Sequence, residues 1–214
     1  MDTAITDHLL STTRAVRRKL DLDRPVGNEV IIECIRLATQ APTASNIQYW
    51  RWVVVRDQSL KDELGKLFRK VGNAYMQRRV KALGEAVNEP AMARAVASGQ
   101  YLVDVIERVP VFVIPCIEGR PPSNNAALSV FYGSIFPAVW SFQLALRSRG
   151  LGSTLTSYHL EYEVEAAKIL GIPNNVTQVG LLPVAYTTVP DFKPAPRDPV
   201  EQIAYLDGWG RPLI

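Results

Sequence analysis

Four short polar side chains between Pro42 and Trp50 are the first candidates for chemistry. They are Thr43, Ser45, Asn46 and Gln48. Hydroxyl and amide groups of this kind can bind either the backbone or a ligand. Taken alone, the stretch is more typical of an ordinary loop between a helix and a strand, because most polar loop residues carry no function.

Several common catalytic motifs are missing from the sequence. No G-x-G-x-x-G follows a predicted strand, and there is no phosphate-binding G-x-x-x-x-G-K-[S/T] loop, G-x-S-x-G or H-E-x-x-H. His8 and His159 are the only histidines and no C-x-x-C occurs, so a metal site is not expected. If the protein is an enzyme, we expect the reactive group to be a bound cofactor, with the protein supplying the pocket and its electrostatics.

Composition and charge limit the class of protein and the partners that it can have. Of the 214 residues, 47% are hydrophobic and 21% are charged, as is usual for a globular protein. A net charge of +3 is too small to indicate a nucleic-acid partner. Cys34 and Cys116 each lie in an apolar run, which predicts buried thiols and a reducing, cytoplasmic environment. The first residues contain no apolar run of signal-peptide length.

The elements that must position these groups alternate irregularly between helices and strands. Apolar residues at helical spacing predict helices over residues 4–20, 29–40, 59–70 and 162–170. Apolar runs predict strands over residues 52–55, 109–116, 151–155 and 176–185. Asn28 is the expected N-cap of the second helix, and the cations from Arg14 to Lys19 are expected to form a solvated basic turn. Residues 71–100 are predicted to form one or two mobile, exposed helices. Two interpretations are open: a lid, or a solvent-exposed segment without that role.

Residues 126–146 form the longest stretch without a charged residue, and two interpretations are open. The length reaches that of a membrane span. The stretch also contains Ser129, Pro137 and Gln143, and the sequence has no second stretch of this kind. A central helix buried on all sides of a core explains it better, so no membrane partner is expected.

Five segments occur in an order that resembles the FMN-dependent nitroreductase family. They are Arg14-Ala-Val-Arg-Arg18, Pro42-Thr-Ala-Ser-Asn-Ile-Gln-Tyr-Trp50, Gly150-Leu-Gly-Ser-Thr154, Leu170-Gly-Ile-Pro173 with Val179-Gly-Leu-Leu-Pro-Val-Ala-Tyr186, and Arg197-Asp-Pro-Val-Glu201. Each is weakly specific alone, but together they span nearly the whole chain. The resemblance implies one α+β domain over residues 1–214, with a central mixed or antiparallel sheet flanked by helices. It also implies an intertwined homodimer that shares two FMN sites, with residues 187–214 as a C-terminal arm.

The resemblance also assigns flavin contacts to particular residues. The phosphate would be held by Arg14, Arg17 and Arg197, with Lys193 as a helper, which agrees with the affinity of phosphate for guanidinium groups. The ring and ribityl chain would be lined from the other subunit by Pro42, Thr43, Ala44 and Asn46. The other side of the ring would meet Leu155, Thr156, Ser157 and Tyr158, with a backbone N–H near Ser157 facing flavin N5.

Three positions depart from the family pattern. Thr13 stands where many members carry arginine, and Ala15, which would still line the cofactor, stands where serine is usual. Both changes are expected to weaken phosphate and ribityl contacts. Tyr49 replaces a common proline and is expected to alter only the stiffness of the loop. A mid-chain lysine and asparagine of other members have no assigned equivalent among Arg69, Lys70 and Asn73.

The activity implied is reduction of FMN by NAD(P)H, followed by reduction of a nitroarene or quinone in the same cleft. The rate law would be ping-pong, and no side chain is assigned a catalytic role. Two alternatives remain open. Enzymes of this fold also fragment reduced flavin or remove halogen from aromatic rings, and a flavin-binding sensor or carrier would show no useful turnover.

Overall fold

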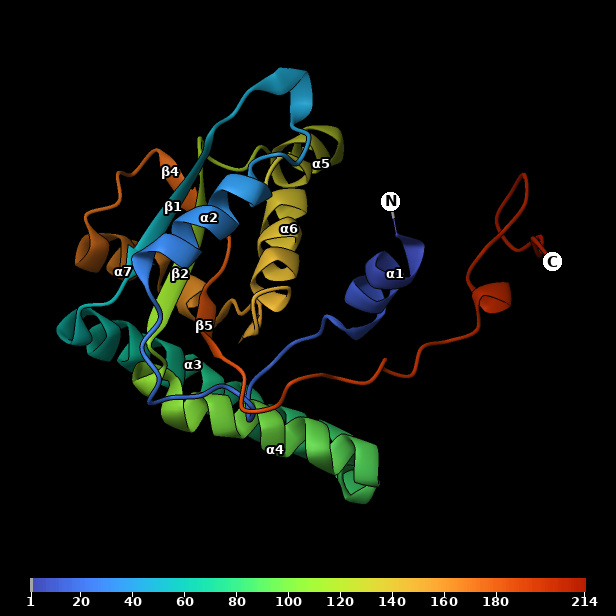
Figure 1. Ribbon diagram of the computed structural model, residues 1–214, viewed down its shortest axis with the longest axis horizontal. Coiled ribbons are helices and arrows are strands. Elements are labelled where there is room, and N and C mark those ends of the chain that lie inside the picture. Colours follow the sequence, from blue (N-terminus) through green and yellow to red (C-terminus); the bar gives the residue numbers. More distant parts are fainter. Residues whose placement is uncertain (1) are drawn as a thin grey trace.

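The structure, a computed structural model, describes residues 2–214 and contains one antiparallel sheet. Its strands are β1 (Trp50–Val55), β2 (Val111–Glu118), β3 (Leu151–Ser153), β4 (Val176–Gln178) and β5 (Leu182–Tyr186). They lie in the order β1-β2-β5-β3, and β4 pairs with the far end of β2. Every pair is antiparallel. The predicted α+β fold with a central sheet is confirmed, and among the described residues the sheet has no parallel pair (Figure 1).

Helices cover both faces of this sheet. One face packs against α2 (Asn28–Ala38) and α6 (Phe136–Arg147), and the other against α3 (Gln58–Leu83), α4 (Pro90–Val105) and α7 (Glu163–Leu170). Successive side chains of a strand point to opposite faces. In β2, Val111 and Val113 therefore enter the first core, while Phe112 and Ile114 enter the second. This double burial explains why β2 reads as a continuous apolar run.

The remaining elements are two shorter helices and the 3-10 turns that connect the larger elements. They are α1 (Thr3–Thr12), α5 (Asn125–Gly133) and the 3-10 turns η1 (Ala44–Asn46), η2 (Gly84–Asn88), η3 (Ile106–Arg108), η4 (Tyr158–Tyr162) and η5 (Val200–Gln202). Residues 187–214 leave the body beside the end of β5 and extend away from it, on the same side as α1 (Figure 1).

The first helix is much shorter than predicted. It ends at Thr12, and the hydroxyls of Thr12 and Thr13 donate to the carbonyl oxygens of His8 and Leu9 in its last turn, both at 2.6 Å. Beyond it the backbone is extended, and the Val16 N–H donates to the Ser153 carbonyl at 2.9 Å. The prediction of a helix to residue 20 was wrong, because pairing with the sheet replaces helical hydrogen bonds there.

The third predicted helix continues past its expected end. The boundary at residue 70 was wrong, since α3 runs without a break to Leu83. Gly72 and Met76, in the part predicted to be exposed, are buried. One narrow stripe of residues 71–83 therefore packs on the core while most of these side chains are exposed, and the predicted mobility of the segment stays a prediction.

The apolar stretch 126–146 is not one buried helix. It forms α5 and α6, separated at Ser134 and Ile135. Pro137 lies in the first turn of α6, where its missing N–H costs nothing, but a proline could not continue a helix from α5. The stretch Asn125–Arg147 is long and apolar enough to cross a membrane by length and composition, yet most of it is not buried in the single chain. The prediction of burial on all sides was wrong, because Val130 and Trp140 are exposed.

Other boundaries need smaller corrections. The predicted strand over residues 176–185 is two strands, because Leu181, between them, pairs with Thr156 instead of continuing the pairing with β2. The N-cap of α2 is Gly27, not Asn28. Trp50 and Trp52 pack on the same core, as the alternation of strand side chains predicts.

Candidate functional site

The segment that carries Arg14 and Arg17 is fixed to the edge of the sheet by Val16. The Val16 side chain is buried, whereas Arg14 and Ala15 are exposed and Arg17 is partly exposed. A Cβ atom on Gly152 would lie 2.9 Å from the Cβ of Val16, so this close approach needs a glycine in β3. The two arginines are thereby held beside the loop that follows β3.

Arg17 is a partly buried cation without an acidic partner. Among residues 2–214 no carboxylate forms an ion pair with it. Burial lowers the pKa of Arg17, the nearby Tyr158 opposes this shift, and Arg79 adds to it. A desolvated cation is unfavourable unless an anion accompanies it. The position therefore favours an anionic ligand.

Residues 155–158, the loop after β3, lie beside the segment that carries Arg17. Backbone hydrogen bonds and aromatic packing hold this loop in place. The Thr156 N–H donates to the Leu181 carbonyl at 3.0 Å, and the Leu181 N–H donates back to the Thr156 carbonyl at 2.8 Å. Tyr158 packs between Phe68 and Tyr75 of α3, with ring centroids 4.9 and 5.4 Å away. Burial raises the pKa of Tyr158. Leu155 and Ser157 remain exposed and free to meet a ligand.

Residues 42–46 form a strained loop at the α5 end of the molecule. The Ala44 N–H donates to the Ser134 Oγ at 3.2 Å, which ties the loop to the break between α5 and α6. Ser45 and Asn46 have φ values of 52° and 55°, in the left-handed region that most side chains avoid. The Thr43 Oγ1 is buried and makes no hydrogen bond within the described part of the chain. The left-handed backbone and the unpaired hydroxyl both occur in the loop to which the family resemblance assigns ligand contacts.

The candidate site thus has two halves, which do not meet within one chain. We call them the Arg17 half (Arg14, Ala15, Arg17 and residues 155–158) and the loop half (residues 42–46). In Figure 1 the η1 loop lies at the top of the molecule, whereas the extended segment after α1 runs to the lower centre beside the end of β5. The structure thus brings Arg14, Ala15 and Arg17 together with residues 155–158. Pro42, Thr43, Ala44 and Asn46 lie apart from them.

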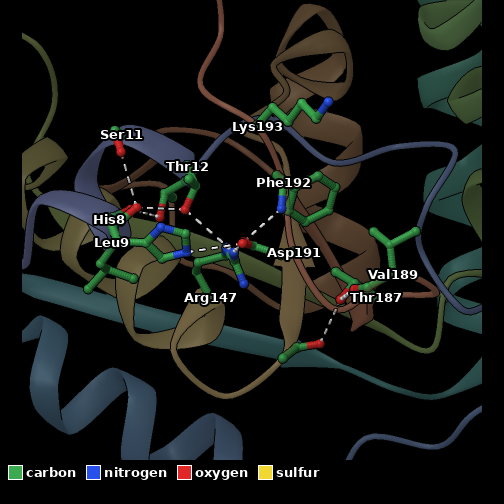
Figure 2. Close-up of polar contacts among 12 residues, drawn as sticks. His8, Leu9, Ser11, Thr12, Arg147, Thr187, Val189, Asp191, Phe192 and Lys193 are labelled. Carbon is green, nitrogen blue, oxygen red and sulfur yellow. Dashed lines mark hydrogen bonds and ion pairs between the residues drawn. The ribbon is translucent and has the colours of Figure 1, made fainter. Parts of the chain in front are cut away.

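The C-terminal arm begins at a polar junction with α1 and α6. Figure 2 shows Asp191 between His8, whose Nε2 is 3.1 Å from the carboxylate, and Arg147, which pairs with the same group. Arg14 donates to the Lys193 carbonyl at 3.2 Å, so the backbone at Lys193 reaches the Arg14 segment. Arg197 is exposed and donates only to the adjacent Pro196 carbonyl at 2.9 Å. In a single chain, Arg197 does not join the other predicted phosphate ligands.

Two residues of α3, Tyr75 and Arg79, lie near Tyr158 and Arg17 and were not predicted from the sequence. Tyr75 and Arg79 lie one helical turn apart, and Arg79 donates to the Tyr75 hydroxyl at 3.3 Å. The i, i+4 spacing of a tyrosine and an arginine would have indicated this pair if α3 had been extended past residue 70. The three unaligned mid-chain residues are engaged elsewhere: Arg69 pairs with Glu107, Lys70 lies over the Tyr162 ring, and Asn73 accepts from Gln100.

Comparison with known proteins identifies the family. The sequence model of the Nitroreductase family matches residues 10–186, and the chain belongs to that family. It is similar to an iodotyrosine deiodinase of Thermotoga neapolitana, with 24% identity over 194 residues, 91% of this chain and 93% of the relative.

Two solved structures show the same fold. One is an oxidised iodotyrosine deiodinase bound to FMN and 3-iodo-L-tyrosine, with a TM-score of 0.65 and 22% identity over 87% of this chain and 90% of that one. The other is nitroreductase A from Vibrio parahaemolyticus, with a TM-score of 0.70 and 15% identity over 98% of this chain and 77% of that one.

Proposed function

We propose that this protein is an FMN-dependent oxidoreductase. The proposal rests chiefly on Arg17, a partly buried guanidinium with no acid beside it among the described residues. Arg14 lies on the same segment, and two guanidiniums suit a phosphate because each offers a charged, planar pair of donors. The buried Thr43 hydroxyl without a partner fits the polar edge of a flavin or its ribityl chain. The FMN-bound deiodinase structure supports the choice of cofactor.

The chain's residues would have distinct roles toward FMN. Arg14 and Arg17 hold the phosphate, and Ala15 lines the path beside them. Residues 155–158 meet one side of the ring, with a backbone N–H near Ser157 toward N5. When bound, FMN would accept electrons from NAD(P)H and give them to an aromatic acceptor. The protein supplies position and exclusion of water, so no side chain is assigned proton transfer.

The other half of each site would come from a second copy of the chain. The loop of residues 42–46 lies apart from the segment that follows α1 in one chain (Figure 1), and a two-fold homodimer can bring the partner's loop to the flavin. The exposed apolar side chains Val130, Phe136 and Trp140 of α5 and α6 support an extensive interface. In that dimer the arm can deliver Lys193 and Arg197 to a phosphate that Arg197 does not reach alone.

The Arg17 assignment predicts a specific loss of cofactor affinity. Arg17→Gln should weaken FMN by roughly tenfold to a hundredfold, the value of one charge-assisted hydrogen bond of about 1.5–3 kcal/mol. Arg18→Gln is the matched control, because Arg18 is the exposed neighbour. FMN affinity is measured by flavin fluorescence during titration of the apoprotein. Equal losses in both variants, or wild-type protein that fails to take up FMN, would overturn the assignment.

Nitroarenes and quinones are the proposed acceptors, with NAD(P)H as donor. Because the sequence has no separate dinucleotide motif, donor and acceptor should use one cleft in turn. Double-reciprocal plots at several acceptor concentrations should therefore be parallel, and intersecting lines would show that both substrates bind together.

Reductive dehalogenation is a second candidate, favoured by the similarity to deiodinases over nearly the full length of the Thermotoga relative. Iodide release from 3-iodo-L-tyrosine by the dithionite-reduced protein, without nitroarene turnover, would select it. Steady oxidation of NADH or NADPH would exclude a flavin sensor or carrier without turnover.

A further inference from the structure

A second arginine, Arg79 on α3, lies beside the Arg17 half of the site and also lacks an acidic partner. Its Nη1 donates to the Tyr75 hydroxyl at 3.3 Å, and its Nη2 lies 3.9 Å from the Sδ of Met92. A phenol oxygen and a thioether sulfur are uncharged acceptors, and the sulfur is a weak one. No carboxylate in residues 2–214 forms an ion pair with Arg79, although its side chain is only partly exposed. It therefore keeps donors and a full charge for an anion that the described chain does not supply.

The surroundings of Arg79 are mostly aromatic and apolar. The Tyr75 ring lies 5.4 Å from the Tyr158 ring, which lies 4.9 Å from the Phe68 ring. The Tyr158 hydroxyl lies 4.0 Å from the Met76 sulfur. Phe68 is buried, but Tyr75 is exposed and Tyr158 is half-buried, so these two rings offer a surface on which another aromatic ring can pack. The arrangement joins an aromatic surface to a fixed cation at its margin.

Arg79 and Arg17 are close enough for their charges to interact. Repulsion from Arg79 contributes to the lowered pKa of Arg17, after the larger effect of burial. Two cations held together without acids raise the local affinity for anions. Under the proposed function the FMN phosphate occupies Arg14 and Arg17. A second anionic group remains to be assigned to Arg79.

We propose that Arg79 binds the carboxylate of an aromatic electron acceptor whose ring packs against Tyr75 and Tyr158. This rests on the proposed function, because Tyr158 belongs to the loop assigned to the flavin ring. The 2′-phosphate of NADPH is a poorer occupant, because it lies on the adenosine ribose, far from the nicotinamide. A carboxylate on the acceptor lies on the reacting ring itself, next to the tyrosines. The protein should thus prefer aromatic carboxylates, such as nitrobenzoates, to their neutral analogues.

The test compares 4-nitrobenzoate with 4-nitrobenzamide, which has a similar shape but no charge. The holoenzyme should show a kcat/KM ratio of acid to amide of about ten or more, as expected for one charge-assisted contact. Arg79→Gln should reduce the ratio to about one, whereas Arg79→Lys should keep part of the preference. Arg78→Gln, at the exposed neighbouring position on α3, is the control and should leave the ratio unchanged.

An equilibrium measurement separates this inference from the proposed function. Benzoate should bind the purified holoprotein more tightly than benzamide in calorimetric titration, and Arg79→Gln should remove the difference. A ratio that survives in Arg79→Gln, or benzoate and benzamide binding equally to the wild type, would overturn the inference. A change in the NADPH to NADH preference or in FMN affinity, with the acid preference intact, would reassign Arg79 to the donor or the cofactor. Loss of both nitro activities with benzoate selectivity retained would instead count against the proposed oxidoreductase activity.

Discussion

His159 has the most buried ionisable side chain near the candidate site. Its imidazole is completely buried, directly after Tyr158 in the loop assigned to the flavin. Burial lowers its pKa to about 4, and the neighbouring Gln178 and Glu163 oppose the shift. Within the described chain neither ring nitrogen makes a hydrogen bond of normal geometry, so the contact with Gln178 is loose. His159 is therefore held neutral inside the fold.

This burial makes stability depend on pH. The folded pKa of about 4 lies below the ordinary value of 6.5, so stability is full above pH 6.5 and falls as the pH drops towards 4. Between pH 7.5 and 5 the free energy of unfolding should decrease by about 2 kcal/mol. Urea denaturation at both pH values measures this loss. In His159→Gln most of the pH dependence over that interval should disappear, and an unchanged slope would show that other groups cause it.

Single residues differ in how far their roles could be predicted. The family resemblance assigned Arg14 and Arg17 to a phosphate, but which groups surround Arg17 in space, including Arg79, could be learned only from the structure. The left-handed backbone at Ser45 and Asn46 could not be predicted, because serine has no intrinsic preference for that region. The unpaired hydroxyl of Thr43 likewise becomes visible only when burial is known.

At the scale of elements, α3 connects the core to the candidate site at Gly72. A Cβ on Gly72 would lie 2.7 Å from a methyl group of Val103 and 3.1 Å from the Tyr158 ring. The glycine therefore lets α3 approach both α4 and the loop of residues 155–158.

Gly72→Ala should destabilise the fold by about 1–3 kcal/mol, because overpacking forces neighbours to shift. Gly133→Ala is the matched control, since a Cβ there meets no atom within 4 Å, and it should be neutral or slightly stabilising. Thermal unfolding measures both variants. The Gly72 variant should also perturb the environment of Tyr158 and weaken FMN. Equal stability in the two variants would contradict the packing argument.

Elements were predicted well where local periodicity and tertiary contacts agree. Strands β1 and β2 and helix α7 follow their apolar patterns, because each contributes side chains to a core. The helix to residue 20 failed because pairing of Val16 with Ser153 outweighs local propensity. The boundary at residue 70 failed because the charged composition of 71–83 hides a narrow buried stripe that contains Gly72 and Met76.

At the scale of the whole molecule, one chain leaves large apolar side chains in contact with water. Trp209 of the arm is 91% exposed, and Trp140 of α6 is 42% exposed. Apolar groups this large, together with Val130 and Phe136, are typical of a surface that associates. The sequence predicted a shared-site dimer chiefly by resemblance, with the apolar stretch 126–146 and the proline-rich tail as secondary support.

Mixed dimers test whether each site is shared. Arg17→Glu damages the phosphate half, and Asn46→Trp blocks the other loop. If sites are shared, a dimer of the two variants has one doubly damaged site and one intact site. Co-expression should then restore about one flavin and one active site per mixed dimer. If each chain builds its own site, every site keeps one lesion and no activity returns, even with mixed dimers demonstrated by two affinity tags.

The position of the arm after the body in the chain has a consequence for biosynthesis. Residues 187–214 follow every strand and α-helix of the body, so they leave the ribosome after it. Each nascent body can therefore fold before its own arm covers a neighbour. Under the proposed arrangement, completion of the site is then a bimolecular step that follows folding of the body. Its rate depends on how many copies are made near one another, so sparse synthesis would leave folded bodies waiting without cofactor.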